Sequence, residues 1–126
     1  MGNVFGVSNG GIKVDVSHVG GLAVTTIRGE LDMGSADELT VALDKLVPEQ
    51  NVVVDLSAVD FMDSSGLAVL LRQSMRRGDA GGALQIRRPS ESVGRLLTFC
   101  CLEHLLEPEL AAEKPKRRWT PRRTKT

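Results

Sequence analysis

The fold is decided by residues 52–67, which read VVVDLSAVDFMDSSGL. The first five of them form a short, nearly continuous apolar run rich in β-branched side chains, which is typical of a strand buried on both faces. We therefore expect this strand in the interior of a sheet. A loop follows it and leads to Asp63, Ser64 and Ser65, any one of which can cap the start of a helix.

Upstream of this stretch, the sequence predicts a β-hairpin and a helix. Apolar and polar residues alternate from residue 12 onward, Gly20 and Gly21 offer a turn, and a β-rich run resumes up to residue 28. Ser35 and Glu38 then match a capping box, in which the two side chains bond each other's backbone amides. Helical spacing follows until Pro48, so we expect a helix over 35–47.

Downstream, the pattern predicts two more helices and one or two more strands. The helix that follows Asp63 should cover 64–77, since Gly78 closes its apolar repeat. A strand is expected at 83–87, and Pro89 then begins a helix over 90–100. The apolar faces of these two helices consist of the following residues: Leu67, Leu70, Leu71 and Met75 in the first, and Val93, Leu96, Leu97 and Cys100 in the second. A last strand near 104–107 is only weakly indicated.

This element order predicts an α/β fold, because strands separated by helices pair in parallel through right-handed crossovers. We expect a single domain over residues 12–113 with a mixed four- to five-stranded sheet and packed helices. Residues 1–11 are expected to be a flexible N-terminus. Residues 114–126 are expected to be a basic, disordered tail.

The formal net charge of zero hides a strong asymmetry. All 16 acidic residues lie at or before Glu113, whereas seven of the 16 basic residues follow it, which gives the first 113 residues a charge of −7 and the rest +7. An acidic domain does not favour direct DNA binding by the folded part. The tail, with Trp119 among its cations, suits contact with anionic partners such as nucleic acid or lipid, or serves only as a solubilising or partner-directed segment.

Composition also bounds the compartment and the chemistry. No apolar stretch approaches the roughly 18 residues of a membrane span, and the first residues lack the pattern of a signal peptide, so we expect a cytoplasmic protein. The two cysteines, Cys100 and Cys101, are adjacent and cannot staple distant segments. We expect reduced, buried thiols and no metal site.

The segment that can carry chemistry lies where the buried strand gives way to the helix. Sites in such sheets favour the carboxyl ends of strands, where loops meet helix N-termini. On the residues alone, Asp63 and Ser64 can equally be plain helix caps. The full pattern resembles the STAS family of anti-sigma-factor antagonists, whose signature is an Asp-x-Ser strand end, an apolar loop and the run FMDSSGL, as in residues 55–67. A second landmark, GELD at residues 29–32, also matches.

The resemblance implies a phosphorylation switch. The acceptor would be Ser64, rather than its neighbour Ser65, and the partner anti-sigma factor, a serine kinase of the GHKL type, would bind the ATP, so this chain needs no cofactor. A PP2C-like phosphoserine phosphatase would reverse the step. Further residues implied in partner binding are Asp32, Met62, Asp63, Ser65 and Gly66. The family's C-terminal helix is poorly represented here, because Pro115 and basic residues interrupt it.

Two other classes of function remain in view. A serine hydrolase would need a nucleophilic serine and a base, but neither Ser64 nor Ser65 lies in a Gly-x-Ser-x-Gly motif. The candidate bases are His18, in the hairpin turn, and His104, near the last expected strand. We therefore expect no catalytic residue. Within the STAS family, the alternative is a phospho-sensor that regulates a signalling complex or transport system other than a sigma factor.

Overall fold

The computed structural model describes residues 3–4 and 11–107. Its sheet contains the expected β-hairpin. β2 (Ile12–Val19) and β3 (Leu22–Leu31) pair antiparallel. Gly20 and Gly21 join them with φ angles of 56° and 84°, which glycine adopts without strain. The buried residues alternate with exposed ones in β2 and mostly with half-buried ones in β3, so the hairpin buries one face more fully than the other.

β4 (Asn51–Met62) lies in the interior of the sheet, as predicted. It pairs in parallel with β3 on one side and with β5 (Ala83–Arg87) on the other. The strand is longer than expected, because it continues through residues 57–62, where a loop was predicted. That prediction was wrong: pairing with the long β3 extends β4 up to the Leu31–Met62 pair.

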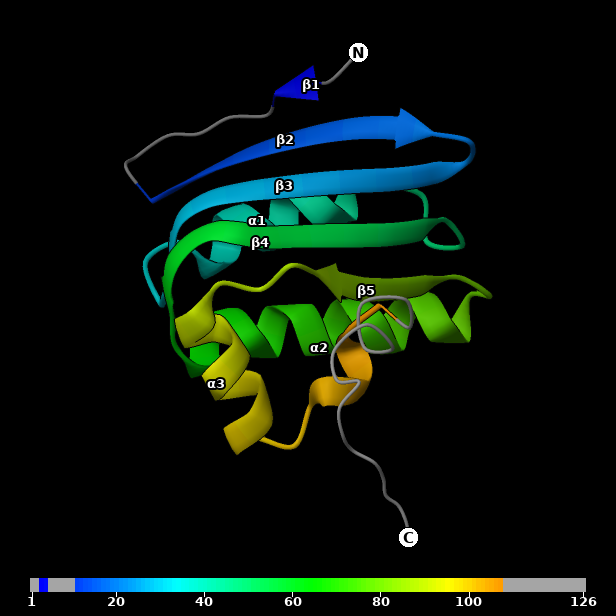
Figure 1. Ribbon diagram of the computed structural model, residues 1–126. Coiled ribbons are helices and arrows are strands. Elements are labelled where there is room, and N and C mark those ends of the chain that lie inside the picture. Colours follow the sequence, from blue (N-terminus) through cyan, green and yellow to red (C-terminus); the bar gives the residue numbers. More distant parts are fainter. Residues whose placement is uncertain (1–2, 5–10, 108–126) are drawn as a thin grey trace, which may run out of the picture.

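The sheet has five strands in the order β1-β2-β3-β4-β5 (Figure 1). β1 (Asn3–Val4) pairs with Val16 and Asp15 of β2, so these two residues of the predicted flexible N-terminus are held in the sheet. The predicted boundary at residue 113 and the basic tail lie outside the described residues.

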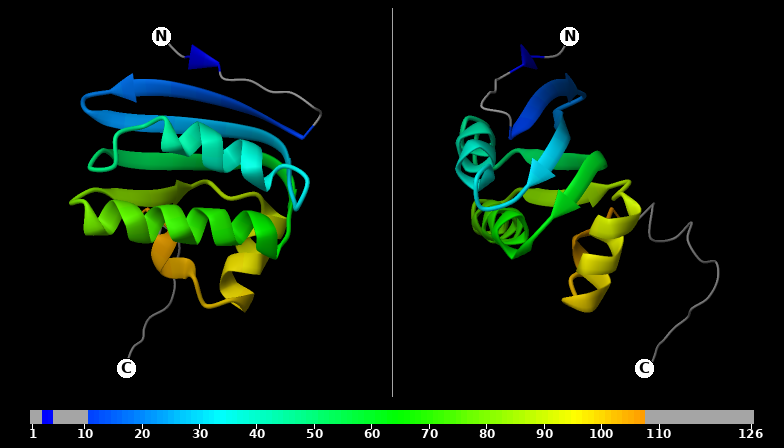
Figure 2. Two further views of the ribbon diagram at one scale, coloured as in Figure 1. Left: turned by 180° about the vertical axis from the view of Figure 1, so that it is seen from behind. Right: turned by 90° about the vertical axis from the view of Figure 1, so that its left-hand side faces the viewer.

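The three α-helices among the described residues confirm the predicted α/β architecture. α1 (Ala36–Asp44) and α2 (Ser64–Asp79) lie side by side against one face of the sheet, and α3 (Glu91–Phe99) is set apart from them near the end of β4 (Figure 2). The hydroxyl groups of Ser90 and Ser92 fasten α3 to β4, because they donate to the carbonyls of Val59 and Asp60 at 2.8 and 3.2 Å.

Arg77 joins α1 to α2 from inside the molecule. Only 2% of it is exposed, and its guanidinium donates to the carbonyls of Leu43 and Val47 at 2.7 and 2.8 Å. The Leu43 carbonyl lies in the last turn of α1 and the Val47 carbonyl in the segment that follows it, so Arg77 holds the C-terminal end of α1 against α2. Burial lowers the pKa of Arg77, but an arginine remains charged at neutral pH. No described helix is long and apolar enough to cross a membrane.

Several local predictions in the second half of the chain were wrong. The weak last strand is replaced by a short 3-10 helix, η1 (Glu103–Leu105), followed by a single parallel bridge between Leu106 and Ile86. Cys100 and Cys101 are exposed rather than buried, since they form the turn after α3, in which Cys101 has a φ of 59°, and the chain returns to the core only with Leu105. Met75 is also exposed, because the buried face of α2 runs through Gln73 and Arg77 instead.

An ion pair locks the middle of β4 to the end of β5. The carboxylate of Asp55 accepts hydrogen bonds from the backbone amide and hydroxyl of Ser57, at 2.9 and 2.8 Å, and pairs with the guanidinium of Arg88. Burial by itself would raise the pKa of Asp55, but the bonds from Arg88 and Ser57 outweigh it and hold the pKa below its ordinary value. Asp55 and Ser57 of the sequence signature are therefore structural.

Gly66 allows the first turn of α2 to press against β3. A Cβ atom at this position would lie 2.8 Å from both Cβ and the carbonyl oxygen of Leu31. Real Cβ atoms do not approach other atoms so closely, and the backbone oxygen cannot move aside. Only glycine therefore fits here.

The Asp55 carboxylate should stabilise the fold in a pH-dependent way. Its pKa is depressed in the folded state, so its contribution is present above the unfolded value of about 3.9 and is lost as pH falls through the folded value. Asp55→Asn should cost about 1–3 kcal/mol at pH 7 in urea unfolding, and the gap to the parent should narrow at pH 3. Asp15→Asn, on the exposed side of β2, should change little. A gap of equal size at both pH values would contradict this account.

Gly66→Ala should destabilise the protein by about 1–3 kcal/mol, because the added methyl group collides with Leu31. Gly94→Ala is the matched control. Gly94 also lies within a helix, but its Cβ would meet nothing within 4 Å, so alanine should stabilise by about 0.4–1 kcal/mol. Thermal unfolding of both variants measures the difference. Equal shifts in the same direction would refute the packing argument.

Candidate functional site

The carboxyl ends of β3 and β4 lie next to each other and hold the predicted site. The backbone N–H of Asp63 donates to the carbonyl of Leu31 at 3.0 Å. Asp32, directly after Leu31, is thereby brought to the same edge of the sheet as Asp63 and the start of α2. Two segments 31 residues apart in sequence thus form one surface.

Asp63 is the N-cap of α2. Its Oδ1 accepts hydrogen bonds from the backbone amides of Ser65 and Gly66, at 2.8 and 3.3 Å. The sequence predicted that one of the residues 63–65 would cap the helix, and the structure identifies the aspartate. Ser64 is therefore the first residue of the helix and not its cap.

Ser64 is the accessible hydroxyl of this surface. Its side chain is exposed, and it has no hydrogen-bond partner among the described residues. Ser65, the neighbouring candidate, is half-buried. No acidic or basic side chain follows within the first turn, which reads SSGL. The Ser64 hydroxyl is therefore open to a reagent or partner at this edge.

A buried serine shapes the turn that carries Asp32. Ser35 donates its hydroxyl hydrogen to the carbonyl of Glu30 at 2.6 Å and accepts the backbone N–H of Asp32 at 3.1 Å. Asp32 itself accepts the N–H of Gly34 at 3.0 Å. The predicted capping box was wrong: Ser35 makes no cap bond because its hydroxyl is engaged in the turn, and the Oε1 of Glu38 is buried without a partner in the described part of the chain.

The implied partner-binding residues divide into two groups. Asp32, Asp63 and Ser65 are half-buried and reach the surface, so a contact role stays a prediction for them. Met62 is 6% exposed and Gly66 is buried, which places both behind the surface as support for the helix start.

Sequence reasoning missed two apolar side chains at this edge. Met33, in the turn after β3, is 78% exposed, and Phe61, at the end of β4, is 48% exposed. Residues 57–62 were expected to form a loop, so the alternation that turns Phe61 outward could not be read. We call Asp32, Met33, Asp63, Ser64 and Ser65 the switch surface.

The structure offers the Ser64 hydroxyl no histidine from the hairpin. His18 pairs with Ala23, which is the neighbour of Val52 at the amino end of β4. Met62, next to the switch surface, is ten residues further along this strand, or roughly 33 Å. His104 is exposed on η1. The described residues also hold no group of three His, Cys, Asp or Glu side chains suited to a metal ion. The Ser64 hydroxyl can accept or present a group, and His18 is too far away to act on it as a base.

The sequence matches known proteins over the same range. The profile of the family described as "Mlab, STAS domain" matches residues 14–107. The anti-sigma-F factor antagonist RsfB of Mycobacterium tuberculosis is 35% identical over 96 residues, which cover 70% of this chain and 79% of the relative.

Solved structures share the fold. An anti-sigma factor antagonist from Mycobacterium paratuberculosis superimposes with a TM-score of 0.70 at 24% identity, covering 87% of this chain and 98% of that one. SpoIIAA is similar in its unphosphorylated form, with a TM-score of 0.65, 19% identity and coverage of 82% and 96%. The phosphorylated form of Bacillus SpoIIAA gives 0.59, again 19%, and coverage of 80% and 97%. Because its sequence matches the STAS profile and RsfB over most of the domain, this chain belongs to the STAS-domain family of anti-sigma-factor antagonists.

Proposed function

We propose that this protein is an anti-sigma-factor antagonist whose binding is switched off by phosphorylation of Ser64. The observation that carries the proposal is the exposed, unpartnered hydroxyl at the start of α2, flanked by Asp63 and by the turn of Asp32. In the unphosphorylated form, the protein binds the anti-sigma factor, which then releases the sigma factor. The names of its relatives support the first half of this statement.

Local charge explains how one phosphate changes the binding state. Phosphorylation adds about −1.5 to −2 charges at neutral pH. The amides of Ser65 and Gly66, which would otherwise receive an anion at the helix start, are already bonded to Asp63. The phosphate therefore gains little from the helix and adds to the negative charge of Asp63.

The fold tolerates this charge, but a partner does not. An exposed group at a helix N-terminus keeps its water and gains about 0.3–1 kcal/mol from the helix dipole. A partner that covers Ser64 must strip that water from a dianion beside a carboxylate, which costs several kcal/mol without a matching cation. Each 1.4 kcal/mol lowers affinity about tenfold, so binding falls by two or more decades.

The proposal assigns the remaining chemistry to partners. The anti-sigma factor is a serine kinase of the GHKL type and binds the ATP, and a PP2C-like phosphatase restores Ser64. This chain then needs no cofactor of its own. We propose a cytoplasmic location, because the kinase of this scheme needs ATP.

Incubation of the full chain with the anti-sigma factor of the same organism and ATP should label Ser64 alone. The reason is accessibility, since Ser64 is exposed and Ser65 is half-buried. Phosphopeptide mapping of the parent, Ser64→Ala and Ser65→Ala measures the site. Label in Ser64→Ala, or its loss in Ser65→Ala only, would refute the assignment of the acceptor. Binding to a kinase without release of a sigma factor would favour the phospho-sensor alternative.

Charge at position 64 should change affinity far more than stability. Because Asp63 and not Ser64 is the cap, Ser64→Ala should unfold within about 0.5 kcal/mol of the parent and still bind the anti-sigma factor. Ser64→Asp should bind at least about tenfold more weakly with a similar melting temperature, although its single charge falls short of a phosphate. Val41→Asp adds the same charge at an exposed position of α1 and should not affect binding. Equal dissociation constants for the two Ser64 variants in calorimetry would contradict the electrostatic mechanism.

A further inference from the structure

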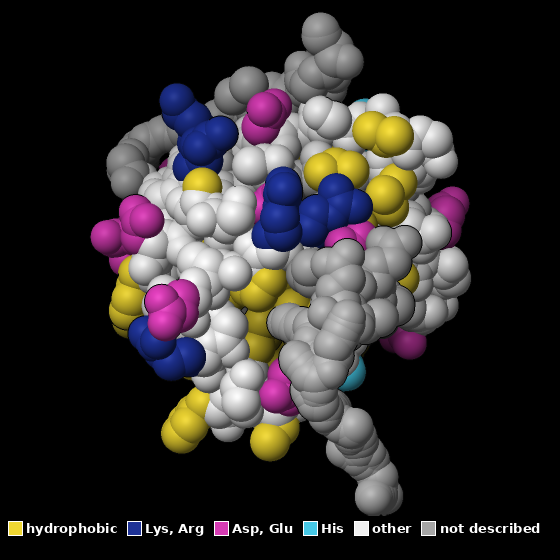
Figure 3. Space-filling view, in the orientation of Figure 1, with side chains coloured by type: hydrophobic (Ala, Val, Ile, Leu, Met, Phe, Trp, Pro, Cys, Tyr) yellow, Lys and Arg dark blue, Asp and Glu magenta, His cyan; other side chains and the backbone are white. Residues whose placement is uncertain are grey.

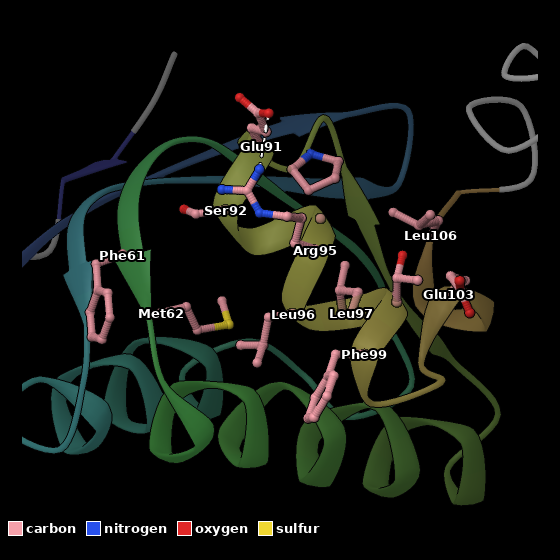
Figure 4. Close-up of a pocket in the computed structure, with 13 residues that line it drawn as sticks. Phe61, Met62, Glu91, Ser92, Arg95, Leu96, Leu97, Phe99, Glu103 and Leu106 are labelled. Atoms are coloured by element: carbon pink, nitrogen blue, oxygen red, sulfur yellow. Dashed lines mark hydrogen bonds and ion pairs between the residues drawn. The ribbon is translucent and has the colours of Figure 1, made fainter.

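A large apolar groove lies beside α3, outside the switch surface. It has a volume of about 1290 Å³, and its walls come from the end of β4, from α3 and from η1 with the residue after it. Figure 4 shows the row of apolar side chains along it, from Phe61 and Met62 to Leu96 and Phe99. Phe99 is 85% exposed, although it is one of only three phenylalanines in the chain. We call this feature the α3 groove.

The α3 groove is continuous with the switch surface. Two of its lining residues, Phe61 and Met62, directly precede Asp63 and Ser64 in the chain. The hydroxyl bond from Ser92 to the carbonyl of Asp60 fixes the start of α3 against the same strand end. A partner seated over Ser64 therefore meets Phe61 at the mouth of the groove.

The switch surface is too small to hold a partner alone. A stable protein–protein interface buries roughly 800 Å² on each side and uses roughly 20–30 residues, and its core favours aromatic and Met side chains. The switch surface has five residues. Figure 3 shows hydrophobic side chains projecting at the lower edge, where α3 lies, and a second group at the upper right, far from α3. The adjacent surface with the character of an interface core is the α3 groove.

Charges around the groove indicate the chemistry of its occupant. Glu91 and Arg95 pair with each other at 3.0 Å on the exposed rim, and Glu103 adds a further carboxylate to the lining. Residues 11–107 as a whole carry 14 acidic and nine basic residues. An apolar segment flanked by lysines or arginines complements such a rim.

We propose that the α3 groove is a second contact for the anti-sigma factor and receives an apolar, basic-flanked segment of it. This inference rests on the proposed function. The α3 groove supplies affinity that does not depend on phosphorylation, and Ser64 supplies the switch. The phosphorylated protein then keeps a weak hold on the partner through the groove, and changes at the two places act independently.

The test is calorimetry with the full chain and the anti-sigma factor of the same organism. Phe99→Ala should raise the dissociation constant about tenfold without lowering the melting temperature, because Phe99 is almost fully exposed. The same factor should appear in the Ser64→Asp background. Val41→Ala, another exposed apolar side chain, is the matched control and should leave affinity unchanged.

Substitutions that add a charge to the groove test whether its occupant is basic. Thr98 is exposed and lines the groove, so Thr98→Lys should weaken binding of a basic-flanked segment, while Thr98→Glu should not. An unchanged dissociation constant for Phe99→Ala, with Ser64→Asp still weakened, would overturn the groove proposal and leave the proposed function intact. Sedimentation measures the oligomeric state of the same variants. If Phe99→Ala converts a dimer to a monomer and leaves the affinity for the anti-sigma factor unchanged, a second copy of this chain occupies the groove. Failure of the unmodified chain to bind the anti-sigma factor at all would refute the proposed function itself.

Discussion

The close approach of α2 to the end of β3 is the packing constraint on which the geometry around Ser64 depends. Gly66 leaves no room for a side chain against Leu31, and the N–H of Asp63 bonds the carbonyl of the same residue. These two contacts fix the first turn of the helix at the carboxyl ends of the parallel pair β3 and β4. Ser64 is therefore presented on a rigid element rather than on a loop, and a change of its charge acts at a fixed position.

The same packing constraint lets the charge on Ser64 change while the shape of the domain stays the same. Asp63 already occupies two of the amides at the helix start, so a phosphate on Ser64 has no ready site to enter and little reason to rearrange the backbone. The α3 groove lies next to this point but is built from other elements, mainly α3 and η1. Affinity and control can thus be carried by neighbouring surfaces that meet where Phe61 and Met62 of the groove precede Asp63 in the chain. Such a division lets a single modification regulate a large interface.

Much of this arrangement could be predicted from the sequence, because it follows from local patterns. The apolar run at 52–56 gave the interior strand, and Asp-Ser-Ser before an apolar repeat gave the start of α2. The predictions failed where tertiary contacts override local preference. Ser35 gives up its capping role to a turn, and β4 extends through 57–62 because β3 pairs with it. The α3 groove could not be predicted, since it joins elements distant in sequence.

Phosphorylation should change the charge of the switch surface and leave the fold unchanged. Native-state amide hydrogen exchange of the phosphorylated and unphosphorylated full chain tests it most directly. We expect altered exchange only near residues 31–36 and 60–68, with the amides of β4 from Val52 to Leu56 equally protected in both forms. Loss of protection in that buried strand on phosphorylation would contradict the account, because the switch would then act through the shape of the domain.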